Sequence, residues 1–385
     1  MKNKRLLFIS NHASFFVSHR INIYQACKKT NNEFRLIFGN PASQKMEKIA
    51  INKLNKEKIK FFNFNYSNNS ISIFKDLISF FKIIFFVKKY EPHIIHSASP
   101  KANLYAGVLG RLFSKTSLVI SFSGMGYLYT NESSNLLTKV KKFVFELVLY
   151  FIFLKYKKRI IVQNKEDYSL LKNKYKIKKK NISIIKGGSG VDLKKFSKIK
   201  RKKTKNIVMI SRVLKNKGAI EFFKAAELLK KKYADWKFII VGSLEYNSPD
   251  IIDRDIINYY KRKKIILFKG YEKNILKVLE NTEIFCLPSY REGMPKSTLE
   301  ALASGIPIVT SDAIGCRDSV IPNKTGFICK TGSYKSLASK IEKLIIDSKL
   351  RKKFSLNAKK YAKNNISINN VTKNIFKVYN DVLND

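Results

Sequence analysis

Two carboxylates, Glu292 and Glu300, flank the start of a predicted helix in the stretch YREGMPKSTLEALASG. Gly293 allows the backbone to approach a ligand without a Cβ in the way, and Pro295 suits the first helical position, where its missing N–H costs nothing. Unpaired amides at a helix start attract anions. Because carboxylates repel phosphates, we expect both acids to accept hydrogen bonds from hydroxyl groups, which sugars supply, on either side of the phosphates. The amides expected to face those phosphates are Met294, Lys296 and Ser297.

Two cations follow a predicted strand in the stretch ISRVLKNKGAIEFF. Arg212 comes directly after the apolar run, and Lys217 precedes Gly218 at the start of the next predicted helix. Arg contacts phosphate oxygens in pairs and Lys acts as a point charge, so the two residues suit a pyrophosphate. In a chain with 76 Lys and Arg residues, their position at a strand-to-helix turn is what makes them candidates.

The first half of the chain offers weaker candidates. The stretch SFSGMGYLY follows a predicted strand but lacks the last glycine of Gly-x-Gly-x-x-Gly, which disfavours a dinucleotide cofactor. In FFVSHRINIY, His19 and Arg20 stand at the start of a predicted helix. In HIIHSASPK, His93 and His96 stand at opposite ends of a predicted strand. For each histidine, a neutral structural role and a role at a site both remain open.

These stretches lie in a chain where short apolar runs alternate with longer amphipathic segments, which predicts helix-covered parallel sheets. One series of runs extends from RLLFIS to ISIIKGGSGVDL and a second from NIVMISR to PIVTS, with the charged stretch SKIKRKKTK between them. We therefore expect a first domain over 1–196, a linker over 197–205 and a second domain over 206–365. The remaining 366–385 predicts a helix that packs back toward the first domain. Two such sheets would face each other across a cleft, with ligands at the carboxyl ends of the strands.

The amino-acid composition excludes few classes of protein, although the net charge is extreme. The chain has 385 residues, 45% of them hydrophobic, so it can bury a large core. The formal net charge of +48 invites phosphate-rich partners. However, a chain so rich in Lys, Asn, Ile and Phe is also what an A/T-rich genome produces. The four cysteines are far apart and form no Cys-x-x-Cys pair, which disfavours a zinc site or a disulfide framework.

Two apolar segments, 71–87 and 143–154, raise the question of a membrane. Each falls short of the roughly 18 uninterrupted apolar residues that span a bilayer. The second is flanked by KVKK and KYKKR, so it suits a helix that lies in the interface and is attracted to anionic headgroups. Burial in the core of an α/β protein is the alternative.

The acids of Asp253-Arg254-Asp255 form an Asp-x-Asp, a motif that binds metal and nucleotide in another class of sugar transferases. Here the motif falls in DIIDRDIINYYKRKK, which we expect to be helical, with the motif in mid-helix. Residues two apart do not share a helix face. We therefore interpret the motif as a solvated helix surface.

Taken together, several motifs over residues 207–330 resemble the donor half of the GT-B glycosyltransferases of family 4, a large retaining group. They are ISR-x4-KG, VGSLEYNSPD, KGY, IFCLPSYREGMPKSTLEALASGIPIVTSDAIGCRDSV and NKTGFIC. First-half motifs are similar to the bacterial branch that builds surface polysaccharides and lipid-linked glycans, often from UDP-N-acetylhexosamines. They are FFVSHR, IIHSASPKANLYAG, SFSGMGYLY, IIVQNKEDYSLL and GGSGVDLKKF.

The resemblance implies an α/β GT-B fold with two Rossmann-like domains, the first on the acceptor side and the second binding the nucleotide sugar. Arg212 and Lys217 would hold the donor diphosphate, Glu292 the hydroxyls of the donor sugar, and Glu300 the ribose. The family requires no metal ion and no cofactor, because two cations and a helix start stabilise the leaving nucleotide. A donor phosphate oxygen would take the proton of the acceptor. The donor-binding residues implied are Gly293, Met294, Pro295, Lys296, Ser297 and Glu300.

One departure concerns the acceptor side. Many members of the family carry a His where this chain has Ser123, so His96 is a possible substitute for that polar contact. The acceptor-side candidates are His19, His96, Ser123, Gly124, Met125 and Gly126.

The hypothesis that follows is a retaining glycosyltransferase that moves a hexose or N-acetylhexosamine from a UDP-sugar to a polyprenyl-diphosphate-linked glycan. It would be cytoplasmic, in peripheral contact with the inner face of the membrane. One alternative is an enzyme like UDP-N-acetylglucosamine 2-epimerase on the same fold, which the scarcity of acids disfavours. The other is a basic nucleic-acid-binding protein. The aromatic residues lie in core-like runs and Lys dominates over Arg, so we expect no specific nucleic-acid partner.

Overall fold

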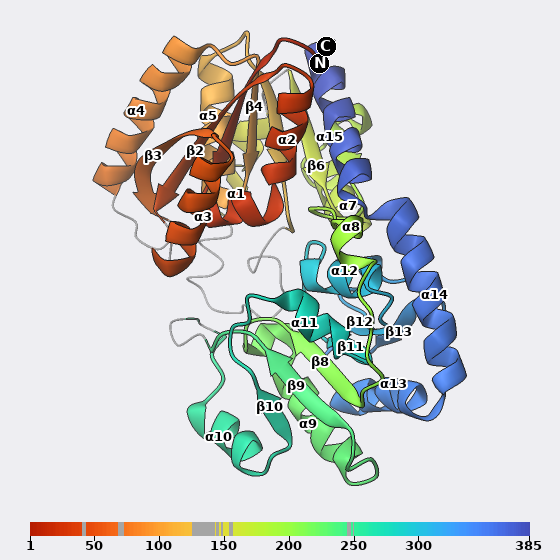
Figure 1. Cartoon of the computed structure of the whole chain (residues 1–385). Coiled ribbons are helices and arrows are strands. Elements are labelled where there is room, and N and C mark those ends of the chain that lie inside the picture. Colours follow the sequence, from red (N-terminus) through yellow and green to blue (C-terminus); the bar gives the residue numbers. More distant parts are fainter. Residues whose placement is uncertain are drawn as a thin grey trace. The chain divides into compact units, whose positions relative to one another are not determined.

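The computed structural model describes residues 1–40, 44–67, 73–124, 143, 146–147, 149–153, 157–244, 248 and 250–385. The chain forms two compact units (Figure 1). The first contains Met1–Ile185 together with Val371–Asp385, and the second contains Lys186–Asn370. Each unit is built on a parallel sheet, so the predicted α/β class is confirmed.

The first unit has, within the described residues, a seven-stranded parallel sheet in the order β3-β2-β1-β4-β5-β6-β7. The strand order reverses direction at β1, which pairs with both β2 and β4. Such a switch point opens a crevice beyond the carboxyl ends of the strands. The strands are β1 Arg5–Ser10, β2 Glu33–Asn40, β3 Lys60–Ser67, β4 Ile94–Ala98, β5 Ser117–Ser121, β6 Lys158–Val162 and β7 Ile182–Ile184.

Helices cover both faces of this sheet, which explains why its strands are apolar on both sides. Alternate residues of β1 belong to different cores: Leu7 packs with α4, α5 and α7, whereas Phe8 packs with α1, α2, α3 and α15. The helices are α1 Ala13–His19, α2 Ile21–Lys29, α3 Gln44–Lys56, α4 Ile73–Tyr90, α5 Pro100–Leu112, α7 Lys165–Asn173 and α15 Ile368–Leu383, with a 3₁₀ turn, η2, at Lys179–Asn181.

The second unit has a six-stranded parallel sheet within the described residues, in the order β10-β9-β8-β11-β12-β13. Its strands are β8 Asn206–Ile210, β9 Lys237–Val241, β10 Ile266–Phe268, β11 Ile284–Leu287, β12 Ile308–Ser311 and β13 Gly326–Cys329. Its helices are α8 Leu193–Phe196, α9 Ala219–Lys230, α10 Arg254–Arg262, α11 Ile275–Glu280, α12 Lys296–Ala303, α13 Tyr334–Ile346 and α14 Ser348–Asn365, with 3₁₀ turns η3 Lys215–Lys217 and η4 Arg317–Ser319. Because β8 lies between β9 and β11, the loops that follow these strands are brought to one edge.

The stretch predicted as a linker, 197–205, lies inside the second unit. Ile199 is buried in its core, the Arg201 Nη2 donates to Ser355 Oγ at 3.2 Å, and the Lys202 amide donates to Glu280 O at 2.8 Å. A highly charged sequence resembles a free linker, but one apolar side chain and a few backbone bonds are enough to hold it against a domain.

The chain returns to the first unit through α15. Its buried residues recur with helical spacing and enter the core formed with β1, β2 and β4. They are Val371, Ile375, Val378, Tyr379 and Val382.

The Asp-x-Asp motif lies at a helix start, so its predicted position in mid-helix was wrong. Asp253 is the N-cap of α10 and accepts from the Asp255 amide at 2.8 Å. Both acids are exposed, so the motif does lie on a solvated helix surface. No helix in the described part of the chain is long and apolar enough to cross a bilayer.

Candidate active site

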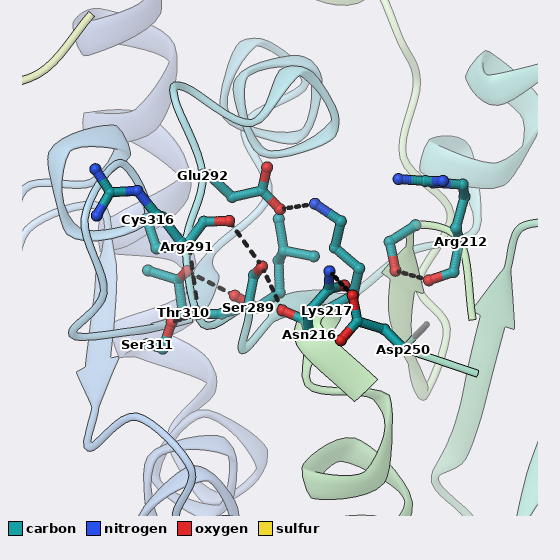
Figure 2. Close-up of polar contacts among 12 residues, drawn as sticks. Arg212, Asn216, Lys217, Asp250, Ser289, Arg291, Glu292, Thr310, Ser311 and Cys316 are labelled. Atoms are coloured by element: carbon teal, nitrogen blue, oxygen red, sulfur yellow. Dashed lines mark hydrogen bonds and ion pairs between the residues drawn. The ribbon is translucent and has the colours of Figure 1, made fainter. Parts of the chain in front are cut away.

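Three loops of the second unit bring cationic and acidic side chains together at the carboxyl edge of its sheet (Figure 2). Arg212 follows β8, Lys217 ends the η3 turn before α9, and Glu292 lies between β11 and α12. The order of the strands places these loops side by side, although Arg212 and Glu292 are far apart in the sequence.

An ion pair between Lys217 and Glu292 is the centre of this site. Lys217 Nζ lies 2.6 Å from Glu292 Oε1, and the two side chains are 19% and 17% exposed. Charge-assisted hydrogen bonds of this length are stronger than neutral ones. The ammonium group has three N–H donors, so a ligand can bind it without removing Glu292.

Two glycines allow the loops to approach so closely. Gly218, with φ of +74°, sits against Pro288, and a Cβ there would lie 2.1 Å from the Pro288 carbonyl oxygen. Gly315, with φ of +79°, would place a Cβ 2.1 Å from the Glu292 carbonyl oxygen. Any larger residue would have to separate the backbones that position Lys217 and Glu292.

A hydrogen-bond network under the ion pair ties the loops together, and no motif in the sequence predicted it. The Asn216 carbonyl accepts from the Tyr290 amide and from Ser289 Oγ, each at 3.0 Å. Asn216 Nδ2 donates to Asp250 Oδ2 at 2.6 Å, and Tyr290 Oη donates to Glu221 Oε1 at 2.8 Å. These residue types are common in loops, so only their contacts reveal the role.

Arg212 is the exposed cation of the site. Its side chain extends from the end of β8 and points its guanidinium toward the Lys217–Glu292 pair (Figure 2). The backbone that carries it is held to the neighbouring strand, because the Val213 amide donates to the Ser243 carbonyl at 3.0 Å. Two cations from different loops therefore face one region of this edge.

The start of α12 adds backbone donors to the same edge. Pro295 is the N-cap of this helix, with an extended ψ of 116°, so its predicted place as the first helical residue was off by one position. The cap provides no side-chain hydrogen bond, and the first turn contains no acid. The backbone amides of Lys296 and Ser297 therefore lie at the positive end of the helix dipole.

Glu300 lies one turn further along α12. Its side chain is 13% exposed, and Lys296 Nζ lies 3.8 Å from its Oε1. Burial raises the pKa of the Glu300 carboxyl above its usual value, while Lys296 and then Lys195 oppose the shift. Glu292 precedes the start of α12 and Glu300 lies within the helix, so the two acids flank the helix start along the chain.

The acceptor-side candidates belong to the first unit. His19 ends α1 and is half-buried. Ser123 and Gly124 follow β5 after Phe122. Ser123 is exposed, and its Oγ accepts from Arg20 Nη2 at 3.1 Å. Gly124 has φ of +113°. Met125 and Gly126 lie outside the described residues.

His96 does not substitute for the missing acceptor-side histidine. It is fully buried in the middle of β4, not at a strand end as predicted. Its Nδ1 hydrogen-bonds Tyr379 Oη at 2.6 Å and its Nε2 hydrogen-bonds Ser121 Oγ at 2.7 Å. Burial lowers the pKa of the ring well below its usual value, with Arg20 adding to the shift. His96 is therefore a neutral core residue that joins α15 to the sheet.

Two α/β units, each built on a parallel sheet, have the GT-B fold, and the structural comparison agrees with that fold. A glycosyltransferase from Rickettsia africae superposes with a TM-score of 0.78 over 100% of both chains, at 20% sequence identity. Residues 191–361 match the family described as glycosyl transferases group 1. This part of the chain is a glycosyl transferases group 1 domain.

Relatives are similar over most of their length. The Campylobacter jejuni N,N'-diacetylbacillosaminyl-diphospho-undecaprenol alpha-1,3-N-acetylgalactosaminyltransferase is 29% identical, over 92% of this chain and 93% of the relative. The Escherichia coli UDP-Gal:alpha-D-GlcNAc-diphosphoundecaprenol alpha-1,3-galactosyltransferase is 26% identical, over 82% of each chain. The chain is thus similar to glycosyltransferases whose named acceptors are diphosphate-linked lipids.

Proposed function

We propose that this chain is a retaining glycosyltransferase that transfers a hexose or N-acetylhexosamine from a UDP-sugar to a glycan linked to a polyprenyl diphosphate. The observation that carries the proposal is the Lys217–Glu292 ion pair beside the uncapped start of α12. The names of the two relatives support it, because both specify a diphospho-undecaprenol acceptor and one specifies UDP-Gal as the donor.

In this proposal the leaving nucleotide is stabilised by groups of the second unit. Negative charge grows on the donor diphosphate as the bond to the sugar breaks. Arg212 and Lys217 face one region of the strand edge (Figure 2), and α12 starts four residues after Glu292. In this proposal these groups receive the growing charge with little reorganisation during the reaction. This positive charge supports transfer without a metal ion.

The two acids of the site have separate roles in the proposal. Glu292 accepts hydrogen bonds from hydroxyls of the donor sugar, and its ion pair with Lys217 holds its carboxylate in place. Glu300 accepts hydrogen bonds from the ribose, at the other side of the helix start. The configuration at the sugar carbon would be retained if a donor phosphate oxygen takes the proton of the acceptor on the face from which the nucleotide leaves. The alpha linkages named for both relatives support that outcome.

We further propose peripheral contact with the anionic inner face of the membrane through the exposed strip of α4. This strip consists of four apolar side chains and three lysines on one face of the helix. The apolar members are Leu77, Ile78, Phe81 and Phe85, which are 48%, 48%, 58% and 73% exposed, and the exposed lysines are Lys82, Lys88 and Lys89. Large exposed apolar side chains beside cations suit insertion at the level of anionic headgroups.

The segment that the sequence analysis favoured for the interface, 143–154, adds to this proposal where it is described. It shows apolar side chains with the same helical spacing as the α4 strip: Phe143, Leu147, Tyr150 and Phe151, which are 62%, 55%, 59% and 44% exposed. Arg111, in the last turn of α5, lies 4.3 Å from the centre of the Phe151 ring. The segment therefore combines exposed apolar surface with a neighbouring cation.

The proposed function is tested by nucleotide release from the purified enzyme with a polyprenyl-diphosphate-linked acceptor. UDP release should fall by about 10²–10³-fold in Lys217→Ala and in Glu292→Ala, since each variant removes a group from the electrostatic site. Lys224→Ala, which removes an exposed lysine of α9, is the matched control. Full activity in both site variants would contradict the site assignment.

The donor nucleotide has its own test. UDP-, GDP- and ADP-sugars are compared for protection against thermal unfolding, because a ligand that binds only the native state raises the melting temperature. We expect protection by UDP-sugars. Protection by GDP- or ADP-sugars alone would overturn the UDP assignment.

A further inference from the structure

Arg20 is a buried cation of the first unit that has no acidic partner among the residues the structure describes. It lies between α1 and α2 and is 4% exposed. Among the described residues, no carboxylate forms an ion pair with its guanidinium. Arg159, the other buried arginine of this unit in the described part, does have such a partner, because it binds the carboxylate of Asp385.

The donors of Arg20 are only partly used. Nη1 donates to the His19 carbonyl at 3.1 Å and Nη2 donates to Ser123 Oγ at 3.1 Å, whereas Nε is buried and has no hydrogen-bond partner in the described part of the chain. Nε and Nη2 lie on the same edge of the planar guanidinium, which is one of the two edges that bind phosphate or carboxylate in bidentate fashion. This edge therefore carries one unused donor and one donor bound only to a neutral hydroxyl.

In the described part of the chain, no neighbouring acid compensates the charge of Arg20. Burial lowers the pKa of Arg20 to about 10, so the side chain is still charged at neutral pH. The titratable side chains nearest to it are Tyr379 and His96, and burial favours the neutral form of both: it raises the pKa of Tyr379 and lowers that of His96. A buried cation without an anionic partner destabilises a fold by several kcal/mol in general, which is unusual unless an anion arrives with a ligand.

The unsatisfied edge lies close to solvent at the carboxyl end of the sheet. Ser123, which covers Nη2, is exposed and directly follows β5 and Phe122. An anion that reached Ser123 from solvent could take its place on Nη2 and also accept from Nε. The Ser123 hydroxyl would then be free to donate to the same anion.

We propose that Arg20 and Ser123 bind the diphosphate of the acceptor, with Nε and Nη2 of Arg20 donating to its oxygens. This inference rests on the proposed function for the nature of the acceptor, and it assigns the recognition of the diphosphate to the first unit. Arg20 is a binding residue in this scheme and takes no part in the chemical step.

The test is calorimetric binding to the full-length protein, with saturating UDP present to occupy the donor site. Two probes are compared: a sugar on a short polyprenyl diphosphate, and the same sugar on a neutral alkyl chain of equal length. Arg20→Gln should weaken binding of the diphosphate probe at least about tenfold, the usual worth of a charged hydrogen bond, and leave binding of the neutral probe unchanged. Arg20→Lys should restore part of the affinity, because it keeps the charge but loses the bidentate edge.

Arg159→Gln is the matched control, since it removes a buried arginine of the same unit that already has a carboxylate partner. It should leave the affinity for the diphosphate probe unchanged. Equal weakening of both probes by Arg20→Gln, or unchanged binding of the diphosphate probe, would overturn the proposal. Because the readout is binding, an enzyme that binds the diphosphate through Arg20 but transfers no sugar would contradict the proposed function and leave this inference standing.

Discussion

At the scale of single residues, burial of a charged side chain can lower the stability of the free protein and favour the binding of a ligand. Glu300 is held in a poorly solvated position that raises its pKa, and Arg20 is buried without an acidic partner within the described chain. Lys217 and Glu292, in contrast, satisfy each other in the free protein. The first two residues depart from the rules for a stable core, and such departures are expected where a ligand completes the environment.

Replacing Glu300 by Gln is expected to raise the Kd for UDP at least about tenfold, because a charged acceptor is lost. The affinity of the wild-type protein for UDP should also fall as the pH decreases below neutrality, because protonation of Glu300 removes acceptor capacity. Burial raises the pKa of Glu300 above 4.5, so this loss of affinity should begin at a higher pH than for an ordinary carboxyl. Calorimetric titrations of UDP at several pH values check both statements. Glu272→Gln, at an exposed position, controls for the change of charge. If Glu300→Gln keeps the wild-type affinity and pH dependence, Glu300 does not contact the nucleotide.

At the scale of elements, the site depends on how closely the loops after β8 and β11 approach. Gly218→Ala is expected to destabilise the protein by about 1–3 kcal/mol, the usual cost of overpacking, and to reduce UDP release sharply, because the new methyl group would meet the Pro288 carbonyl. Gly270→Ala separates this effect from backbone strain, since Gly270 also has positive φ, +63°, but has no atom within 4 Å of its Cβ position. Urea unfolding and activity are measured for both variants. Equal effects would mean that strain, and not the close approach of the loops, is responsible.

The exposed strip of α4 makes a second prediction at this scale. The double variant Phe81→Ser with Phe85→Ser should lose most of its binding to vesicles that contain anionic lipid, because each exposed ring that inserts contributes roughly 1.5–3 kcal/mol. Co-sedimentation with anionic and with zwitterionic vesicles measures the loss. Leu356→Ser with Ile346→Ser is the matched control in the second unit, where these side chains are 71% and 69% exposed. Binding that survives in the α4 variant would place the membrane contact elsewhere.

At the scale of the whole molecule, the chain returns to its first unit through α15, and the hydrogen bond between Tyr379 and His96 joins this helix to β4. Tyr379→Phe should lower the free energy of unfolding by about 1–3 kcal/mol, because it leaves a buried ring nitrogen of His96 without a partner. Tyr259→Phe serves as the control, since Tyr259 is 41% exposed and bonds a surface carboxylate; we expect a change within about 0.5 kcal/mol. Urea titrations compare the two, and equal effects would show that the buried bond adds no stability.

The sequence by itself determined the α/β class and the position of the donor-site candidates. The periodicity and the apolar character of the segments are local properties of the sequence, and they predict the fold class. The Gly-x-Pro before α12 and the Lys-Gly before α9 place Glu292 and Lys217 in the loops that follow strands. Since parallel strands end at one edge of a sheet, neighbouring loops in such a sheet converge there. The structure then showed that these two side chains form an ion pair.

Only the tertiary structure decided the features that depend on contacts between distant residues. It buried His96 against Tyr379, placed 197–205 within the second unit, and joined Asn216 to Asp250 and Tyr290 beneath the ion pair. It also left Arg20 without an acidic partner among the described residues. Burial and partners arise from packing between segments that the sequence keeps far apart, so no local pattern could have revealed them.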